Sequence, residues 1–411
     1  MLVVLLKIVL ALWAVRALNV ALSFLLVPRL ADAPPRRREG SPFVSIVVPA
    51  RNEERDVEDA TRSKCRQDDP SFEVVVVDDL SSDATRRILA GLEHEFPGVL
   101  RVVDGVEPPP DWLGKPHALE EGARASRATR PQDWLVFSDA DVFFEPDVLS
   151  RALVHADRHR LDFLSVFPKL EMRSFGEELM TPSVANVGFC YLPLWLMNVP
   201  GARHFGGGAG VFNLVRRDLF DRIGGYAALK NSVVDDIQLG RNARLAGGRT
   251  GFARALETVS VRMYRGFREI AKGFAKNGYY GIGASLPVAV LCLLLFFLEG
   301  ELAFGVLAGS ALEWAARHAA AAGAAFPHNR VLAPALFTFK EVFLSFLIVA
   351  MTLLVRGALH LKLRYPLTGV VLHPVWVAAL TGIFAWSTFV NGVLGRNEWR
   401  GRLRDARTLR M

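Results

Sequence analysis

Cysteine is scarce in this chain of 411 residues, and the three that occur are far apart. Cys65, Cys190 and Cys292 form no CxxC pair and no even framework, which argues against a disulfide scaffold and a zinc cluster and for a reducing compartment. Internal repeats are lacking, as are low-complexity tracts beyond one alanine run. Apolar residues make up 51% of the chain, which excludes intrinsic disorder and collagen-like sequence.

Net charge is small and confined to two places. Lysine and arginine number 49 against 42 acidic residues, giving a formal net charge of +7. Pro28–Gly40 carries +2 of this excess, and the basic tail Arg396–Met411 carries +4. Both pieces border long apolar segments, which is typical of the flanks of membrane spans. No nucleic-acid partner is expected.

Long apolar segments, by contrast, are abundant, and the mean hydropathy is +0.24. Leu2–Val27 is almost wholly apolar. A secretory signal peptide has a shorter apolar region, with its charge ahead of that region. We therefore predict an uncleaved membrane anchor over residues 1–30, followed by a linker on the cytosolic side. Lys7, Arg16 and Asn19 interrupt the apolar run.

From about residue 41 to residue 263, short apolar runs alternate with charged stretches of helix length. The runs are continuous and rich in β-branched residues, as in strands buried on both faces of a parallel sheet. This alternation predicts an α/β domain with its functional residues at the carboxyl ends of the strands. The runs are Phe43–Pro49, Glu73–Asp78, Leu100–Val103 and Trp134–Ser138, and the stretches include Glu53–Arg66 and Asp83–Phe96.

A helical pattern with a basic face follows at residues 264–280. Met263, Phe267, Ile270 and Phe274 share one face, and lysines and arginines take the other positions. Such a helix suits a membrane surface, and packing against the domain is the alternative.

Three or four membrane segments are predicted in residues 281–395. Asn277–Leu298 and Tyr365–Gly395 contain no Asp, Glu, Lys or Arg, and Leu336–Val355 contains two charged residues near one end. Leu302–Phe326 is alanine-rich and includes an acid and a base. Three spans would place the basic tail (residues 396–411) outside and four would place it inside. We favour four spans and a tail inside.

Polar residues follow the first two predicted strands. Pro49, Ala50, Asn52 and Glu53 end the first strand and open a loop that could hold a nucleotide, although an ordinary strand–helix turn has the same pattern.

Asp78 and Asp79 end the second strand. Acids at the end of a buried strand are costly unless they bind something, so both are candidates to contact a base or ribose. Asp83 is better placed as a helix N-cap.

Asp139 and Asp141 form a DxD pair directly after a hydrophobic strand. Carboxylates two residues apart can turn towards one cation, and Mg²⁺ or Mn²⁺ prefers a few carboxylates plus phosphate oxygens. Lys115, at a predicted loop-to-helix junction, could meet a phosphate or could simply be solvated.

Asp235 and Asp236 begin another predicted helix, where the helix dipole alone favours acids. The functional interpretation makes one of them a general base. The glycine-rich run at residues 206–210, which contains Gly207 and Gly208, is not GxGxxG, so a dinucleotide site is excluded; we predict that it lines an acceptor channel.

Together these segments resemble glycosyltransferase family 2, whose members have the GT-A fold. The similarity covers roughly residues 41–280 and rests on the order and spacing of six motifs. They are VSIVVPARNEE (Val44–Glu54), VVVVDDLSSDAT (Val74–Thr85), WLGK (Trp112–Lys115), FSDAD (Phe137–Asp141), the segment Gly206–Tyr226 and VVDDIQLG (Val233–Gly240). The membrane layout is similar to that of members acting on carotenoids, hopanoids or ceramide.

The resemblance implies roles for several residues. Asp78 and Asp79 match the nucleotide-binding acids, Asp139 and Asp141 match the metal motif, and Asp236 matches the base. It implies an inverting, Mg²⁺- or Mn²⁺-dependent transfer of a sugar from a nucleotide-diphospho-sugar, expected to be UDP-linked, to a hydroxyl of a membrane lipid. The protein would then be a multi-pass inner-membrane enzyme with its catalytic domain facing the cytoplasm.

One departure concerns the motif that processive and ceramide-type members carry after the base. No Arg-Trp pair stands in the basic helix, where Lys276 could replace the arginine as an acceptor-site residue. The tail sequence Glu398–Arg402 resembles the carotenoid-type members instead. The alternatives are a processive polysaccharide synthase and a catalytically inactive membrane adaptor or transporter subunit.

Overall fold

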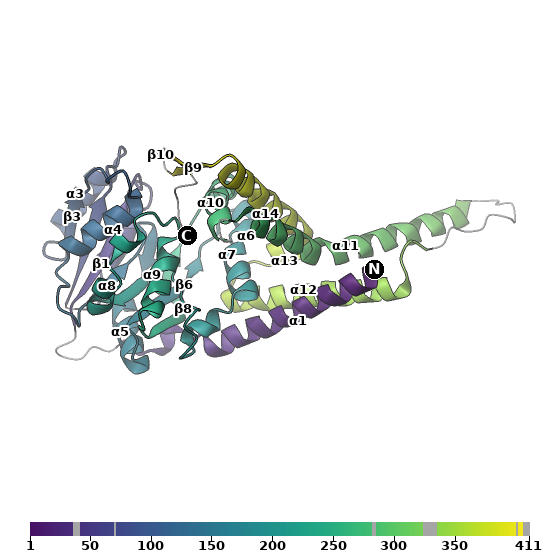
Figure 1. Ribbon diagram of the computed structural model, residues 1–411, viewed down its shortest axis with the longest axis horizontal. Coiled ribbons are helices and arrows are strands. Elements are labelled where there is room, and N and C mark those ends of the chain that lie inside the picture. The colour runs from purple at the N-terminus through teal and green to yellow at the C-terminus, as the bar shows by residue number, and fades with distance from the viewer. Residues whose placement is uncertain (36–41, 70, 282–284, 324–334, 400–401, 406–411) are drawn as a thin grey trace. The chain divides into compact units, whose positions relative to one another are not determined.

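The computed structural model describes residues 1–35, 42–69, 71–281, 285–323, 335–399 and 402–405 (Figure 1). The chain forms two compact units. The sheet unit comprises Leu22–Arg173, Pro193–Arg265 and Leu394–Met411, and the helical unit comprises Met1–Ala21, Ser174–Leu192 and Gly266–Val393. The predicted linker residues Arg36–Arg38 and the tail residues Arg400, Gly401 and 406–411 lie outside the described residues.

The sheet unit is built on eight strands in the order β3-β2-β1-β4-β7-β6-β8-β5. Strands β3, β2, β1 and β4 pair in parallel, as do β6 and β8, while β7 and β5 run antiparallel to their neighbours. This mixed, mostly parallel sheet confirms the predicted α/β class. The strands are β1 (Val44–Ala50), β2 (Phe72–Asp78), β3 (Leu100–Asp104), β4 (Trp134–Phe137), β5 (Val142–Phe144), β6 (Phe163–Leu170), β7 (Asn213–Arg216) and β8 (Thr250–Val261).

The four predicted strands form within about a residue of the expected bounds. β2 and β4 are buried throughout, as continuous apolar runs predict. β3 differs, because it lies at the sheet edge and pairs with β2 alone. Arg101 and Asp104 are exposed there, so the expectation that this run is buried on both faces was wrong.

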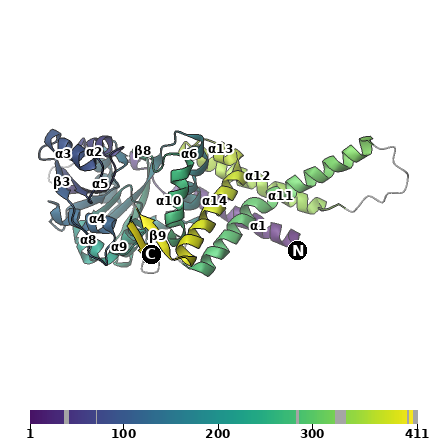
Figure 2. The same cartoon turned by 90° about the horizontal axis from the view of Figure 1, so that it is seen from above.

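Helices cover both faces of this sheet (Figure 2). Figure 2 shows α2 and α3 on one side of the sheet and α4, α8 and α9 on the other. The second group shares a core with β1, β4, β6 and β7, built around Val47, Leu119, Phe137 and Phe220. The helical segments of the unit are η1 (Leu30–Asp32), α2 (Val57–Cys65), α3 (Thr85–Glu95), α4 (Gly114–Ala125), α5 (Val148–His159), η3 (Leu194–Asn198), α8 (Arg217–Arg222), η4 (Tyr226–Leu229) and α9 (Asp235–Leu245).

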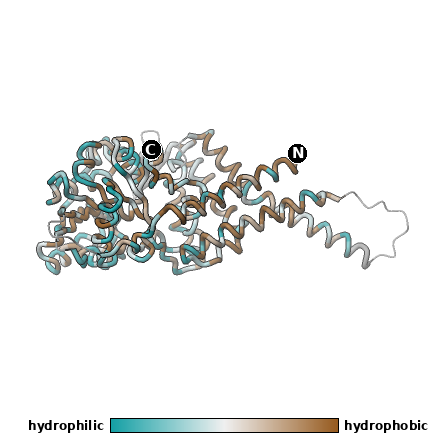
Figure 3. The backbone as a smooth tube through the Cα atoms, turned by 90° about the horizontal axis from the view of Figure 1, so that it is seen from below, coloured by the Kyte–Doolittle hydropathy of each residue, from teal (hydrophilic) through white to brown (hydrophobic). Residues whose placement is uncertain are grey.

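Among the described residues, four helices are long and apolar enough to cross a membrane: α1 (Leu2–Leu26), α11 (Leu286–Gly323), α12 (Phe339–Leu363) and α14 with η5 (His373–Val393). Figure 3 shows the hydrophobic colouring along them. The short helices are α6 (Phe175–Met180), α7 (Ser183–Asn186), η2 (Val187–Tyr191) and α13 (Thr368–Val371), and η5 is Thr388–Val393.

The predicted segments Asn277–Leu298 and Leu302–Phe326 are not two spans. Residues 286–323 form one continuous helix, α11, whose apolar part is Leu286–His318. The chain therefore has three C-terminal candidate spans among its described residues, and our preference for four was wrong. Glu313 and Arg317 lie within this helix and form an i,i+4 ion pair of 2.7 Å.

The predicted basic helix is α10 (Gly266–Gly281). Its backbone lies against the last span, where the Tyr279 N–H donates to Ser387 Oγ at 3.0 Å and Asn391 donates to the Ala275 carbonyl at 3.0 Å. Ile270 is buried while Lys272 is exposed. The helix is thus packed within the helical unit, and its place at a membrane surface stays a prediction.

Polar residues that interrupt α1 are used inside the helical unit. Arg16 forms an ion pair with Glu299 of α11, and both side chains are under 10% exposed. The Asn19 amide donates to the carbonyls of Phe189 and Leu192 at 2.9 Å each. These contacts tie the N-terminal helix to segments far along the chain, which an anchor without partners would not need.

Candidate functional site

The predicted site residues gather where the parallel strands end. β1 ends at Ala50, β2 ends at Asp78, and the DxD turn directly follows β4. Asp78 pairs with Ala50 in register, which brings the first two loops together. Carboxyl ends of parallel strands form the usual ligand-binding edge of an open α/β sheet.

The loop after β1 is tied to the loop after β2. Asn52 adopts φ 53°, and its side-chain oxygen accepts the Ser82 N–H at 2.8 Å. The Glu53 N–H donates to Thr85 Oγ1 at 2.8 Å. Asn52 is therefore occupied in shaping the loop, and the nucleotide contacts predicted for Pro49, Ala50, Asn52 and Glu53 stay predictions.

The three acids after β2 have different surroundings. Asp78 Oδ1 is buried and has no hydrogen-bond partner among the described residues, so it can accept from a ligand. Asp79 is paired with Arg51, whose Nη1 donates to the Asp79 carbonyl at 2.6 Å. Asp83 accepts the N–H of Thr85, the first residue of α3, at 2.9 Å. It thus bonds a free N–H at the start of the helix, although Ala84 occupies the N-cap position.

The DxD turn is held by contacts to a glycine and a lysine. The Asp139 N–H donates to the Gly210 carbonyl at 2.9 Å, and Lys115 Nζ lies 2.7 Å from Asp139 Oδ1. A Cβ at position 210 would lie 2.6 Å from Asp139 Oδ2, so a larger residue there would displace the Asp139 side chain. Burial raises the pKa of Asp141 to about 7, with Asp139 and Glu53 adding to the effect.

A buried lysine that sequence reasoning missed lies behind this turn. Lys64 of α2 is fully buried, and its ammonium donates to the Val142 carbonyl and lies 5.3 Å from the Phe144 ring centroid. Burial lowers the pKa of Lys64 to about 8, while Asp141 and Asp139 oppose that shift. Nothing in the pattern of the predicted helix 53–66 marked this lysine as buried.

The carboxylates of Asp139 and Asp141 suit a divalent cation that arrives with phosphates. Across the described residues, no group of three or more His, Cys, Asp or Glu side chains is placed to hold a metal ion. Mg²⁺ in nucleotide sites commonly takes one or two carboxylates and completes its shell with phosphate oxygens and water. Asp141, whose pKa is raised by burial and further by its neighbour Asp139, fits that donor set together with Asp139.

The paired acids Asp235 and Asp236 form the first turn of α9, as predicted. Asp236 Oδ1 accepts the Ile237 N–H at 2.8 Å, and the Gly210 backbone also donates to this carboxylate. Asp235 is 4% exposed, and its Oδ2 has no hydrogen-bond partner in the described part of the chain. Burial raises the pKa of Asp235 to about 7 and raises that of Asp236, while Lys115 opposes both shifts.

Lys115 lies among these acids as the second residue of α4. Burial disfavours its charge, but Asp139, Asp235 and Asp236 together hold its pKa above the usual range. The structure thus brings four predicted residues from three separate segments to one recess. The recess is lined by Lys115, Leu119, Phe137, Ser138, Asp139, Gly210, Asn213, Tyr226, Asp235 and Asp236.

The glycine-rich run packs against the backbone of α9. A Cβ at Gly208 would lie 2.3 Å from the Asp236 carbonyl, and one at Gly240 would lie 2.0 Å from the Gly207 carbonyl. Glycine therefore allows the close approach that places Asp235 and Asp236. The acceptor-site roles predicted for Gly207, Gly208 and Lys276 stay predictions, and Lys276 belongs to the helical unit.

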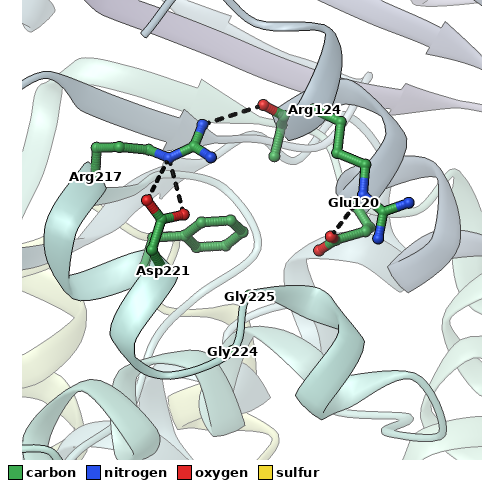
Figure 4. A pocket seen from close by; sticks show the side chains of 8 residues that line it. Glu120, Arg124, Arg217, Asp221, Gly224 and Gly225 are labelled. Atoms are coloured by element: carbon green, nitrogen blue, oxygen red, sulfur yellow. Dashed lines mark hydrogen bonds and ion pairs between the residues drawn. The ribbon is translucent and has the colours of Figure 1, made fainter. Parts of the chain in front are cut away.

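A larger pocket of about 140 Å³ lies elsewhere in the sheet unit (Figure 4). Its arginines are already paired, Arg217 with Asp221 at 2.9 Å and Arg124 with Glu120 at 3.0 Å. None of the predicted site residues lines it. Lys115, Asp139, Asp235 and Asp236 line the recess at the strand ends instead.

Known proteins resemble this chain in both sequence and fold. The 4,4'-diaponeurosporenoate glycosyltransferases of Staphylococcus aureus strains USA300 and MRSA252 are each 24% identical over 269 residues, covering 63% of this chain and 67% of theirs. The mannosyltransferase PcManGT of Pyrobaculum calidifontis, solved with GDP-Man and Mn²⁺, matches 96% of this chain and 99% of its own with a TM-score of 0.53 and 19% identity, which supports the GT-A fold. The family model described as glycosyltransferase like family 2 matches residues 41–275, more than half of the chain. The chain therefore belongs to this family and is a glycosyltransferase.

Proposed function

We propose that this glycosyltransferase moves one sugar from a UDP-sugar to a hydroxyl group of a membrane lipid. The observation that carries the proposal is the recess at the strand ends, where a DxD acid, a lysine and two paired acids meet. This arrangement offers separate groups for a diphosphate and for an acceptor proton.

The donor would bind along the strand ends. Asp78, with its unpaired buried oxygen, is suited to accept from the base, and Asp79 lies beside it. Mg²⁺ or Mn²⁺, held by Asp139 and Asp141, would neutralise charge developing on the leaving diphosphate. Lys115 adds a point charge at the same place, since it can exchange Asp139 for a phosphate oxygen.

Asp236 is proposed as the base of a single displacement with inversion. Its carboxylate takes the acceptor proton while the acceptor oxygen bonds to the anomeric carbon, and the bond from that carbon to the diphosphate breaks. The backbone donors from Ile237 and Gly210 fix its orientation. A pKa raised by burial brings a carboxylate nearer to the working pH, as efficient general bases require.

A lipid acceptor is supported by the four apolar helices and by the relatives named for 4,4'-diaponeurosporenoate. The basic face of α10, with Arg268 and Lys272 exposed, suits a membrane surface. We place the protein in the inner membrane with the catalytic domain, residues 41–263, facing the cytoplasm, because Arg36–Arg38 follow the first span and nucleotide sugars are made there.

The test uses the full-length chain in lipid nanodiscs prepared from cell membranes. UDP-glucose, UDP-N-acetylglucosamine and GDP-mannose are supplied separately with Mg²⁺ or Mn²⁺, and extracted lipids are analysed by mass spectrometry. We expect one lipid to gain one hexose or one N-acetylhexosamine, Asp236→Asn to slow product formation about 10²–10⁴-fold, and excess chelator to abolish it. Transfer from GDP-mannose alone would refute the UDP donor, and full activity in chelator would refute the metal.

The same assay separates the alternatives. A polymer of many sugars would identify a processive synthase, and nucleotide binding without hydrolysis or transfer would identify an inactive adaptor.

A further inference from the structure

Tyr226 is a recess residue to which sequence reasoning assigned no role. It lies in η4, about ten residues before the paired acids, and its side chain is 1% exposed. Its ring packs edge-on against Phe137, with centroids 4.8 Å apart at 81°, and beside Phe220 at 6.1 Å. The Tyr226 N–H donates to Glu120 Oε2 at 3.0 Å. The ring is thus fixed from several sides.

The Tyr226 hydroxyl is expected to be protonated near neutral pH. Burial raises its pKa well above the usual value, and Asp235, Asp236 and Asp139 add to that effect in this order. A neutral phenol that lies near carboxylates serves as a hydrogen-bond donor.

Two polar groups at this recess have room for a common partner. Tyr226 and Asp235 both line the recess, and Asp235 Oδ2 is buried with no hydrogen-bond partner among the described residues. Buried polar atoms are rarely left unsatisfied in native proteins. The free volume of the recess is about 10 Å³, close to the minimum that one water molecule needs.

We propose that one water molecule in the recess links the Tyr226 hydroxyl to Asp235, so that Tyr226 is a positioning residue for the paired acids. This inference rests on the proposed function, in which those acids serve the reaction. A tyrosine that only filled the core would need its ring but not its hydroxyl, and Phe137 and Phe220 show that the surroundings suit a plain aromatic ring.

The experiment is a double-mutant cycle with Tyr226→Phe and Asp235→Asn in the full-length protein. Tyr226→Phe keeps the ring and removes the donor, so kcat should fall about 5- to 50-fold, while the KM for the donor sugar and the melting temperature stay within error. If the hydroxyl acts through Asp235, adding Tyr226→Phe to Asp235→Asn should cost no further activity.

Tyr264→Phe is the matched control. Tyr264 also lies near acids, since burial with Asp141 and Asp139 raises its pKa to about 12, but it does not line the recess. Its effect on turnover should add to that of Asp235→Asn. The inference would be overturned if the losses of kcat in Tyr226→Phe and Asp235→Asn add up in the double variant. An unchanged kcat in Tyr226→Phe would overturn it as well.

A second measurement does not depend on the variants. A high-resolution structure of the wild-type protein should contain a water within hydrogen-bond distance of both the Tyr226 hydroxyl and Asp235 Oδ2. A direct bond between these atoms, or a recess without that water, contradicts the inference. If Asp235→Asn and Asp236→Asn both keep full activity, the proposed function itself is wrong. Additive losses in Tyr226→Phe and Asp235→Asn would refute only the role of Tyr226.

Discussion

At the scale of single residues, the neighbouring carboxylates Asp235 and Asp236 have different hydrogen-bond partners. We therefore expect Asp236 to be the base and Asp235 to have a supporting role. Asp236→Asn keeps an oxygen that can accept the Ile237 N–H, so the fold should survive. The amide cannot take the acceptor proton, so turnover should fall about 10²–10⁴-fold. Nucleotide affinity should change little, since the proposed donor contacts belong to other acids. Turnover and nucleotide binding are measured at equal folded concentration.

Asp235→Asn is the paired control and should be milder. The opposite pattern would reassign the base to Asp235. Loss of nucleotide binding in Asp236→Asn would instead make Asp236 a donor-site ligand.

Activity should rise with pH above the range in which an ordinary carboxyl group titrates. Burial raises the pKa of Asp236, the proposed base. A base works only when it has lost its proton, so turnover should be low at acidic pH and should level off only above the usual carboxyl pKa of about 4. The measurement is kcat against pH with saturating donor. A flat profile between pH 5 and 8 would contradict the raised pKa.

The stability of the folded protein should fall with rising pH, whereas its activity should rise. An unfolded aspartate has a pKa near 3.9, and the folded values of Asp235 and Asp141 are about 7. Because the folded state holds these protons more tightly, their stabilising effect is complete below about pH 4 and is lost as the pH rises through 7. Asp235→Asn should therefore reduce the loss of thermal stability between pH 5 and 8. An equal loss in wild type and variant would show that Asp235 does not cause it.

At the scale of elements, sequence predicted the parallel half of the sheet better than the rest. β1, β2 and β4 are continuous apolar runs, so periodicity alone marks them. β5 (Val142–Phe144) is three residues long and pairs with Val259–Val261 of β8, and no local pattern reports a partner so far along the chain.

The site likewise contains residues that the sequence predicted and residues that it did not. Asp139, Lys115 and the acids Asp235 and Asp236 were predicted because polar residues at strand and helix ends are visible in sequence. Tyr226 and Lys64 were missed because their importance lies in burial beside those acids, which depends on tertiary packing.

The close packing of the glycine run against α9 gives a prediction for an element contact. Gly240→Ala places a Cβ 2.0 Å from the Gly207 carbonyl, so α9 must move. We expect a loss of about 1–3 kcal/mol in the free energy of unfolding and a clear loss of turnover, because α9 carries both acids. Chemical denaturation and activity assays measure the two effects.

Gly91→Ala is the matched control for this substitution. Gly91 lies inside α3 with nothing within 4 Å of its added Cβ, so alanine should stabilise the helix by about 0.5–1 kcal/mol and leave activity unchanged. If Gly240→Ala behaves like Gly91→Ala, the glycine run does not position α9.

At the scale of the whole molecule, the two units interrupt each other in sequence. Ser174–Leu192 lies inside the segment 41–263 that sequence predicts as one domain, yet it groups with the membrane helices. Trp376 Nε1 of α14 donates to Ser183 Oγ at 2.8 Å, and Arg356 of α12 donates to Asn186 at 3.3 Å. Residues 41–263 expressed alone would lack the partners of these polar groups and of their apolar neighbours. Assays should therefore use the full-length chain.

The Arg16–Glu299 ion pair joins the first helix to the C-terminal helices, and its burial makes it a test of that assembly. Arg16 also lies 4.2 Å from the Tyr191 ring centroid, and Trp13 donates to the Glu299 carbonyl at 3.2 Å. Arg16→Leu leaves Glu299 buried without its countercharge, which costs about 3–5 kcal/mol when one partner of a buried pair is removed.

Combining Arg16→Leu with Glu299→Leu removes both charges, and replacing a buried pair with apolar residues is often neutral or stabilising. We therefore expect a lower melting temperature in detergent for each single variant and recovery in the double variant. Lys7→Leu serves as the control, because Lys7 is exposed on the same helix and should change little. Losses in the single variants that simply add in the double variant would show that the two residues act separately. Recovery would instead show that α1 is an integral part of the helical unit, held to α11 by a contact that a cleaved signal peptide could not make.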